Sequence, residues 1–552
     1  MDVVLVGLPG SGKSAVGRRL AHRHDASYID LDETIEREAG VSVPEIFATE
    51  GEEGFRARER HAVEALGPAD PAAIVRRVIA TGGGAVVEPR NRWRLYRGRL
   101  AIWLDGRPEV LAQRLRRSPN LRPLVAGRDP IGTVRALATA RERFYGAAHR
   151  VNGVAEVQSV IDAVDDIVTQ AIERIDPSAP APGTTLLRVE TKIGWIEIGE
   201  GIAAEAIEAA LRRLQARRAI LVSEPGAWAA AGEAIAAELA GSGWAVEHVL
   251  LPQGEPAKRL AVIEDGAREV ARLRVERREP LVAIGGGALG DAAGFLAATY
   301  LRGVPLIHVP TTLVAQIDSS IGGKTAVNLP EGKNLIGAFH QPHAVVIDVS
   351  LLRTLPPRQL RAALGEAMKM GALGDDRLLD LLEEAGPAIA EGQSGPFDSG
   401  AVAELIERAG WAKVEVVLAD ERESGQRRIL NLGHSLGHAF EAAGGYEDLL
   451  HGEAVAYGLR AAVRIGVAVG VTPADRRERI EALLTRLALA VDPLPYDLSS
   501  IREALGRDKK HAAGRLNWVL PTADGVRITD EVPEDLVDRV ASGLLAGSGV
   551  PA

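Results

Sequence analysis

A glycine-rich loop near the front of the chain restricts the fold more than any other feature. Residues 7–14 read GLPGSGKS, which fits the pattern G-x-x-x-x-G-K-[ST]. An apolar stretch at residues 3–6 predicts a strand before the loop, and a helical pattern starts at Ala15. In this context glycines let backbone N–H groups converge on phosphate oxygens at a helix N-terminus. The alternative, a glycine-rich turn without a ligand, is disfavoured by the strand and helix on either side.

We therefore predict a nucleotide site on this loop. The Lys13 ammonium would add positive charge beside the β- and γ-phosphates, and the Ser14 hydroxyl would reach Mg²⁺. The predicted nucleotide-binding residues are Gly10, Ser11, Gly12, Lys13, Ser14 and Ala15.

The length predicts further domains behind the loop. The chain has 552 residues, enough for roughly three to four domain-sized units. Pro, Ala and Gly dominate residues 176–185, DPSAPAPGTT, as in a linker. Short apolar runs alternate with helical patterns before and after this segment, which predicts parallel sheets covered by helices. From about Pro356, long Ala/Leu/Glu-rich segments predict a mostly helical region.

These patterns predict an α/β fold class. We expect a phosphate-loop domain with a parallel sheet, then a Rossmann-like α/β domain, followed by a mostly α-helical domain. The predicted boundaries are 1–174 for the first domain, 175–185 for the linker, 186–355 for the second domain and 356–552 for the third.

Composition narrows the classes of function. The formal net charge is −10, which disfavours wholesale binding of nucleic acid. Apolar stretches are short or interrupted by charges, so we expect no membrane span. The chain has no cysteine, so a metal ion would be held by His, Asp or Glu. It begins Met-Asp without a basic and apolar leader, and we expect a cytoplasmic enzyme.

Charged residues in the first half indicate what kind of molecule receives the phosphoryl group. The stretch YIDLDETI places Asp30 and Asp32 at the end of a predicted strand, where alternating residues share a face. One carboxylate could hold Mg²⁺ through water, and the other could orient or deprotonate an acceptor hydroxyl. Three arginines, Arg56, Arg122 and Arg141, could clamp a carboxylate. Each of them taken singly could also be a solvated surface residue.

Together these residues resemble shikimate kinase over nearly all of residues 1–170. The order is phosphate loop, Asp-x-Asp, Phe-Arg, Gly-Gly-Gly, Arg-Pro-Leu and Arg-x-x-x-Tyr. A gluconate or nucleoside-monophosphate kinase would share the loop, but it would not be expected to carry this whole set. The resemblance implies ATP-dependent phosphorylation of shikimate, with Lys13, Asp32 and Arg122 in catalysis. It implies that Ser14, and Asp30 through water, hold Mg²⁺, that Arg116 or Arg117 stacks on adenine, and that shikimate contacts Asp32, Arg56, Gly82, Gly83 and Arg141.

A second glycine pattern follows the linker. Residues 281–295, LVAIGGGALGDAAGF, contain Gly285-x-Gly287-x-x-Gly290 after a predicted strand. This resembles a dinucleotide fingerprint, but the acidic residue expected about 20 positions later is missing. An ordinary Rossmann dehydrogenase is therefore disfavoured, although a pyrophosphate could still lie on the turn.

Histidines in the helical region suggest a metal site. His434 and His438 are spaced i, i+4 on a helical pattern and share a face. Together with His451 and Glu366 they could hold a divalent ion with open positions for substrate. The alternative for each histidine is a hydrogen-bonded residue without metal.

Residues 309–342, followed by LGEAMKMG and NLGHSLGHAFEAAGGYEDLLHGEAVAYG, resemble 3-dehydroquinate synthase. The resemblance runs from about residue 186 to about residue 545. It implies Zn²⁺ (or Co²⁺) on Glu366, His434 and His451, with His438 near the substrate phosphate. It also implies tightly held NAD, bound by Glu255, Lys258, Gly286, Gly287, Asp291, Thr311, Thr312, Lys324 and Lys333.

The same resemblance implies the substrate 3-deoxy-arabino-heptulosonate 7-phosphate, which becomes 3-dehydroquinate plus phosphate. NAD would take up and return a hydride and would not be consumed. The implied catalytic residues are Asp318, Lys324, Lys369, Arg427 and His438. The implied substrate residues are Arg302, Asp318, Lys324, Asn334, Lys369, Lys413, Arg427, Asn431, His438 and Lys509.

Both resemblances point to the biosynthesis of chorismate and the aromatic amino acids. We expect small-molecule substrates, no nucleic acid or membrane partner, and a homodimer built on the synthase half. Three alternatives stay open: another sugar-phosphate cyclase, a metal-dependent polyol dehydrogenase, or one catalytically silent half.

Overall fold

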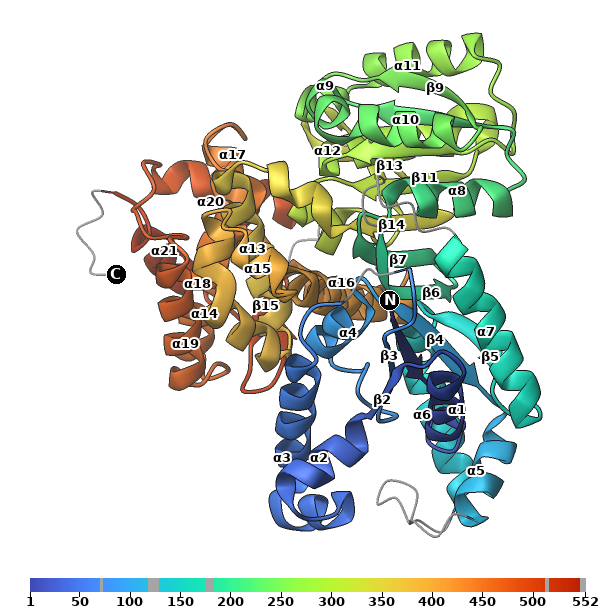
Figure 1. Ribbon diagram of the computed structural model, residues 1–552. Coiled ribbons are helices and arrows are strands. Elements are labelled where there is room, and N and C mark those ends of the chain that lie inside the picture. Colours follow the sequence, from blue (N-terminus) through green and yellow to red (C-terminus); the bar gives the residue numbers. More distant parts are fainter. Residues whose placement is uncertain (70–72, 118–128, 174–182, 424, 512–515, 547–552) are drawn as a thin grey trace. The chain divides into compact units, whose positions relative to one another are not determined.

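A computed structural model describes residues 1–69, 73–117, 129–173, 183–423, 425–511 and 516–546 (Figure 1). The chain divides into two compact units, Met1–Glu190 with Trp195–Ile202, and Thr191–Gly194 with Ala203–Ala552. Within the described ranges, no helix has the length and apolar character needed to cross a membrane.

The first unit is built on a five-stranded sheet in the order β2-β3-β1-β4-β5. All neighbouring strands in it are parallel. The central strand is fully buried, as expected where helices cover both faces of a parallel sheet. The five strands are β1 (Asp2–Val6), β2 (Ser27–Asp30), β3 (Arg77–Ala80), β4 (Leu100–Asp105) and β5 (His149–Asn152).

Helices of the first unit follow its strands in turn. One core packs Val3 and Leu5 of the central strand against Leu20 of α1 and Val164 of α7. The helices are α1 (Lys13–Arg23), α2 (Leu31–Ala39), α3 (Val43–Ala65), α4 (Pro89–Tyr96), α5 (Pro108–Arg117), α6 (Pro130–Tyr145) and α7 (Val157–Glu173). The predicted strand, loop and helix at the front of the chain are confirmed.

The second unit carries a sheet with the strand order β14-β11-β10-β8-β9. Neighbouring strands in it are parallel. The strands that follow β5 along the chain are β6 (Thr184–Thr191), β7 (Gly194–Glu200), β8 (Arg218–Ser223), β9 (Ala245–Leu250), β10 (Leu281–Gly285), β11 (Leu306–Pro310) and β14 (Ala344–Asp348). An antiparallel hairpin, β12 (Lys324–Leu329) and β13 (Gly332–Phe339), precedes β14.

The helices beside this sheet are mostly short. The α-helices are α8 (Ala203–Arg213), α9 (Pro225–Ala227), α10 (Glu233–Gly241), α11 (Leu260–Arg272) and α12 (Gly287–Thr299). Two π-helices are η2 (Trp228–Gly232) and η5 (Ala315–Ser319). The 3-10 turns are η3 (Glu255–Ala257), η4 (Tyr300–Arg302) and η6 (Val349–Thr354). Leu296 of α12 shares a core with Leu281 and Leu306 of the sheet.

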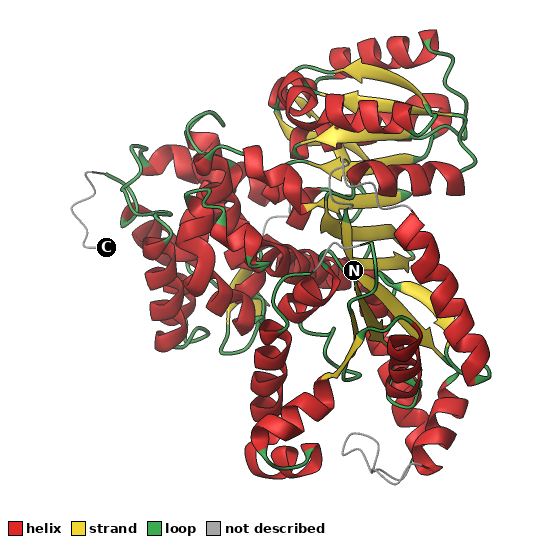
Figure 2. Ribbon diagram, in the orientation of Figure 1, coloured by secondary structure: helices red, strands yellow, loops and turns green. Residues whose placement is uncertain are grey.

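After β14 the chain is almost entirely helical (Figure 2). The helices are α13 (Pro357–Ala372), α14 (Asp376–Ala390), α15 (Gly395–Asp398), α16 (Ala401–Ala419), η7 (Gln426–Asn431), α17 (His434–Ala443), α18 (His451–Ala468), α19 (Ala474–Arg486), α20 (Leu498–His511) and α21 (Glu534–Ser542). A small hairpin is formed by β15 (Trp518–Pro521) and β16 (Val526–Thr529). The predicted fold class, α/β with a helical third region, is confirmed.

Glycines bring three of these helices unusually close together. A Cβ atom at Gly365 of α13 would collide with the carbonyl oxygen of Gly452 in α18. One at Gly458 of α18 would collide with the carbonyl oxygen of Gly433, which caps α17. Backbones that touch in this way leave no room for any side chain. The helices α13, α17 and α18 are therefore held at a spacing that only glycine permits.

We predict that Gly452→Ala destabilises the protein. Its Cβ would meet the carbonyl oxygen of Ala362, and the helices would have to separate. Overpacking of this kind costs about 1–3 kcal/mol in free energy of unfolding, measurable by urea denaturation. Gly506→Ala is the matched control, because this glycine of α20 has open space around it and alanine favours a helix. Equal losses in the two variants would contradict the packing argument.

Candidate active sites

In the first unit, the Lys13 side chain hydrogen-bonds to the backbone of the phosphate loop that contains it. Lys13 Nζ donates to the carbonyl oxygens of Gly7 and Leu8, at 2.8 and 3.0 Å. Gly12 has a φ of 95°, a left-handed conformation that glycine adopts without strain, and it leads directly into α1. The predicted nucleotide residues therefore lie on one loop and the first turn of one helix.

Asp30, at the end of β2, is hydrogen-bonded to the first turn of the helix that follows this loop. Its Oδ2 accepts hydrogen bonds from Ser14 Oγ at 2.8 Å and from the Tyr28 hydroxyl at 2.9 Å. The structure thus brings together the two residues predicted to hold Mg²⁺, and Tyr28 is a neighbour that the sequence analysis missed. A carboxylate and a hydroxyl are ligands that suit this ion, so the residues present fit it.

The strand predicted to carry both aspartates ends earlier than expected. β2 stops at Asp30, and Asp32 lies in the first turn of α2. Asp30 caps this helix, because its Oδ1 accepts the N–H of Asp32 at 3.1 Å. The alternation argument for Asp32 was therefore wrong, since a capping aspartate stops the strand and starts a helix.

Asp32 nevertheless faces the glycines that follow β3. A Cβ atom at Gly82 would lie 2.8 Å from Asp32 Oδ1 and 3.1 Å from Glu59 Oε1. The Arg56 guanidinium donates to Glu59 at 2.7 Å. Burial raises the pKa of Glu59, and the charge of Arg56 opposes that shift. Glu59 was missed in the sequence analysis, although its i, i+3 spacing from Arg56 on a helix was a signal.

Arg141 reaches the same glycine turn from α6. Its Nη1 donates to the carbonyl oxygen of Gly83 at 2.8 Å, and the Tyr145 hydroxyl donates to the same oxygen at 2.5 Å. Burial raises the pKa of Tyr145 to about 12. The structure therefore gathers the predicted shikimate residues Asp32, Arg56, Gly82, Gly83 and Arg141 around one turn.

Two predictions for the kinase half stay without a structural account. Arg122 lies outside the described residues. Arg116 and Arg117 are exposed in the last turn of α5, and neither is singled out as the adenine contact.

Glu366, His434 and His451 come together from three helices in the second unit. Their ligand atoms all lie within 4.8 Å of one another. Glu366 Oε1 is 3.5 Å from His434 Nε2 and 3.2 Å from His451 Nε2. The Glu366 carboxylate is fully buried, and its other oxygen, Oε2, is paired with Lys369 Nζ. Two imidazoles beside such a carboxylate fit a zinc or cobalt ion.

The protonation states of these histidines differ. Burial and the nearby Lys369 lower the pKa of His434 to about 3, so its Nε2 lone pair is free for a ligand. Burial lowers the pKa of His451, but hydrogen bonds with Glu366 and Glu441 outweigh it and raise the pKa to about 10. His438 lies beside both rings, 5.2 Å from His434 and 5.9 Å from His451 between ring centres.

A group of buried cations surrounds Asp318 next to this site. Asp318 Oδ1 is 3.0 Å from Lys413 Nζ and 3.7 Å from Lys369 Nζ, and Lys369 is also 2.6 Å from Glu366. Burial raises the pKa of Asp318, but the two lysines outweigh it and lower the pKa to about 2. The fully buried Arg427 donates to the carbonyl oxygen of Gly322 at 3.2 Å. Buried charges are tolerated here because they are paired.

Glu423 contacts two further predicted substrate residues, Lys324 and Asn431. It forms an ion pair with Lys324 and accepts a hydrogen bond from Asn431 at 3.4 Å. Burial raises the pKa of Glu423, but the contact with Lys324 outweighs it, and the pKa lies below its usual value. No spacing signal in the sequence pointed to this glutamate.

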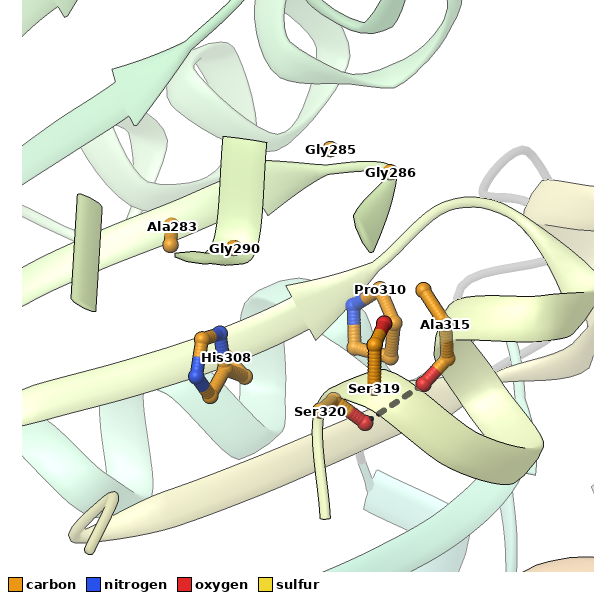
Figure 3. A pocket seen from close by; sticks show the side chains of 9 residues that line it. All are labelled: Ala283, Gly285, Gly286, Gly290, His308, Pro310, Ala315, Ser319 and Ser320. Atoms are coloured by element: carbon orange, nitrogen blue, oxygen red, sulfur yellow. Dashed lines mark hydrogen bonds between the residues drawn. The ribbon is translucent and has the colours of Figure 1, made fainter. Parts of the chain in front are cut away.

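The glycine turn between β10 and α12 lines a small pocket. Figure 3 shows His308 of β11 below Gly290, and Ser319, the last residue of η5, beside Pro310 and below Gly285 and Gly286. Burial lowers the pKa of His308 to about 4, so this imidazole is neutral. The lining residues are Ala283, Gly285, Gly286, Gly290, His308, Pro310, Ala315, Ser319 and Ser320.

Most predicted cofactor residues lie near this turn or on the hairpin beside it. Lys258 Nζ is 2.6 Å from Asp291 of α12 and also donates to Asn334 of β13. A Cβ at Gly286 would lie 3.2 Å from the Thr312 methyl group. Lys333 Nζ lies 4.0 Å from Glu255.

Glu224 is an acidic residue of this region that the sequence analysis missed. It follows β8 directly and is 6% exposed. Its carboxylate accepts N–H groups from Gly254 at 2.6 Å and from Gly286 at 3.5 Å. Glu224 thus lies beside the glycine turn, at the carboxyl end of the strand next to β10 in the sheet. Ligands of open α/β sheets bind beyond these carboxyl ends.

The structure does not link the predicted substrate residue Arg302 to the group around Asp318, and it does not describe the Lys509 side chain. Within the described part of the chain, no hydrogen bond or ion pair links Arg302 to that group; this residue is exposed in η4 with a φ of 65°. Lys509 lies in α20, and its side chain is outside the described residues. Both assignments stay predictions.

Known proteins match both halves. The family model for shikimate kinase matches residues 9–176. The models for the N-terminal and C-terminal domains of 3-dehydroquinate synthase match residues 248–362 and 363–511. A 3-dehydroquinate synthase from Synechococcus sp. is 44% identical over 327 residues, which cover 59% of this chain and 88% of the relative.

The chain belongs to the 3-dehydroquinate synthase family. A shikimate kinase domain precedes the synthase, so the fusion predicted from the sequence is confirmed, and the protein combines a transferase with a lyase of the chorismate route. A synthase from Symbiobacterium thermophilum is 43% identical over 347 residues, 62% of this chain and 95% of the relative.

Solved structures resemble the synthase half. A 2-epi-5-epi-valiolone synthase from Streptomyces hygroscopicus, with NAD⁺ and Zn²⁺ bound, is 29% identical with a TM-score of 0.59, covering 63% of this chain and 96% of that one. A 2-deoxy-scyllo-inosose synthase with carbaglucose-6-phosphate, NAD⁺ and Co²⁺ is 28% identical with a TM-score of 0.57, covering 63% and 96%.

We predict that Glu224→Ala weakens NAD binding by the synthase half. Two backbone N–H groups that shape the glycine turns would lose their charged acceptor. A hydrogen bond to a charged group is worth about 1.5–3 kcal/mol, so the dissociation constant should rise about tenfold or more. Calorimetric titration with NAD⁺ measures it. Glu233→Ala, at an exposed position of α10, is the control, and equal affinities in both variants would contradict this role.

Proposed function

We propose that the chain catalyses two reactions of one biosynthetic route. The first is phosphorylation of the 3-hydroxyl of shikimate by ATP with Mg²⁺. The second is conversion of 3-deoxy-arabino-heptulosonate 7-phosphate to 3-dehydroquinate and phosphate. The observation that carries the second proposal is the buried Glu366–His434–His451 group beside paired lysines, in a chain of the synthase family.

In the kinase half, the residues around the Gly82–Gly83 turn would hold the acceptor. Arg56 and Arg141 would bind the shikimate carboxylate, since guanidinium groups bind carboxylates in a bidentate manner. Asp32 would accept a hydrogen bond from the reacting hydroxyl and orient it toward the phosphate loop. Lys13 would leave the loop carbonyls that it contacts and bind the nucleotide phosphates.

In the synthase half, Glu366, His434 and His451 would hold zinc, and the residues around the β10–α12 turn would hold NAD. When bound, zinc supplies a Lewis acid and NAD supplies reversible hydride transfer. His434 fits this role, since its neutral Nε2 already faces Glu366.

The paired cations would bind the anionic groups of the sugar phosphate. Lys369, Lys413 and Arg427 are nearly fully buried, and a phosphate or carboxylate that replaces water around them would be strongly attracted. Lys324 and Asn431 share Glu423, so substrate binding would require an exchange of partners there. His438 would contact the phosphate from the exposed face of α17.

A different sugar-phosphate cyclase is the second candidate for this half. The solved structures described above are a valiolone synthase and an inosose synthase, and both are under 30% identical. The two relatives described above, 44% and 43% identical, are 3-dehydroquinate synthases, which favours the heptulosonate substrate. We also propose a homodimer through the synthase half, and the domain boundaries 1–174, 186–355 and 356–552.

We predict that Lys13→Ala abolishes ATP-dependent phosphorylation of shikimate and leaves the synthase reaction unchanged. The lysine lies in the first unit, and the zinc, NAD and sugar-phosphate residues that we propose lie in the second. Coupled assays of ADP formation and phosphate release on the same preparation measure both activities. Loss of both activities would contradict independent catalytic halves.

We predict that the purified protein releases phosphate from 3-deoxy-arabino-heptulosonate 7-phosphate with NAD⁺ present. Chelation should stop the release, and added Zn²⁺ should restore it, because a buried carboxylate and two imidazoles need a divalent ion to act on a hydroxyl. Shikimate phosphorylation with Mg²⁺ present serves as the control for an intact chain. Release from sedoheptulose 7-phosphate alone would favour the second candidate.

A further inference from the structure

We propose that Glu441 is a positioning residue that turns His451 toward the metal. This inference rests on the proposed zinc site and concerns a residue that plays no part in the assignments above. Glu441 lies in α17 and is 5% exposed, and its Oε2 is 3.3 Å from His451 Nδ1.

The two nitrogens of His451 face two different carboxylates. Nε2 lies 3.2 Å from Glu366 Oε1, and Nδ1 lies against Glu441. Both carboxylates are acceptors only, so without a metal either nitrogen can carry an N–H; with an ion held between Nε2 and Glu366, only Nδ1 would donate, and its acceptor would be Glu441. The lone pair of a neutral ring is then on Nε2, on the side of Glu366 and His434.

His434 is held in the same way by a different group. Its Nδ1 lies 3.0 Å from the carbonyl oxygen of Leu432, and its Nε2 faces Glu366. His451 is the first residue of α18 and its side chain is 37% exposed, so packing fixes its ring less tightly. Glu441 therefore faces Nδ1 of His451 as a hydrogen-bond acceptor, in the way that the carbonyl oxygen of Leu432 faces Nδ1 of His434. Partners of this kind set the orientation of metal-binding imidazoles.

The second oxygen of the Glu441 carboxylate faces a lysine. Glu441 Oε1 lies 3.8 Å from Lys333 Nζ, and this ammonium stands 4.3 Å from the centre of the Tyr446 ring. The buried carboxylate thus has a cation on one oxygen and the histidine on the other. It is a fixed acceptor, not a mobile surface acid.

A competing arrangement uses the same histidine. His438, Glu441 and His451 also bring three ligand atoms within 4.8 Å, so Glu441 could be a ligand instead of a positioning residue. Glu366 separates the two arrangements, because it belongs to only one of them.

The test measures Zn²⁺ affinity by competition with a chromophoric chelator, on the full chain without substrates. Glu441→Ala should bind zinc about 10- to 100-fold more weakly than wild type. Glu441→Gln should fall between the two, because its amide oxygen still accepts from Nδ1. Glu447→Ala, at an exposed position shortly after α17, should match wild type. Glu366→Gln should lose most of its zinc, and His438→Asn should keep it.

The following results would contradict the positioning role or the zinc site on which it rests. Equal affinity of Glu441→Ala and wild type, or no rescue by Glu441→Gln, would overturn the positioning role. Zinc retained by Glu366→Gln but lost from Glu441→Ala and His438→Asn would assign the metal to the competing group and overturn it as well. Wild-type protein without zinc affinity would overturn the proposed function itself. Thermal melting of each variant shows that it is folded, and Glu441→Gln carries the test if the alanine variant does not fold.

Discussion

The close approach of α13, α17 and α18 is the constraint on which the synthase half depends. Gly365 precedes Glu366, Gly433 precedes His434 and Gly452 follows His451, so each predicted ligand adjoins a glycine at which two backbones touch. Interiors are packed too densely for a larger residue to be absorbed there. The glycines thus set the helix spacing, and the helix spacing sets the distances between the three ligands.

Both halves pair charged side chains with groups of opposite charge. Asp318 lies among lysines, Lys324 is paired with Glu423, and in the kinase half Arg56 is paired with Glu59. The nearby lysines lower the pKa of Asp318 and of Glu423, although burial by itself would raise it. An anionic substrate that enters either site must therefore exchange one partner for another, and this exchange favours ligands of matching charge over neutral ones.

Sequence patterns predicted local features well. The strand, loop and helix around Lys13 follow from glycine spacing and apolar runs, and the shared face of His434 and His438 follows from helical periodicity. Asp32 was assigned wrongly because the strand ends at Asp30, whose carboxylate accepts the N–H of Asp32 and caps the next helix, and a single residue type does not reveal where that happens. Glu224, Glu423 and Glu441 were missed because each acts on residues that are distant in the sequence or on another element.

The sequence by itself determined the parallel-sheet and helical architecture, the phosphate loop and the types of residue that can bind metal and anions. These depend on short-range spacing, which is visible along the chain. Only the tertiary structure decided which of the neighbouring histidines share a carboxylate, and which acids hold Lys324 and His451 in place. The physical reason is that these pairings arise where separate helices and strands pack, at distances set by side-chain volume and not by position in the sequence.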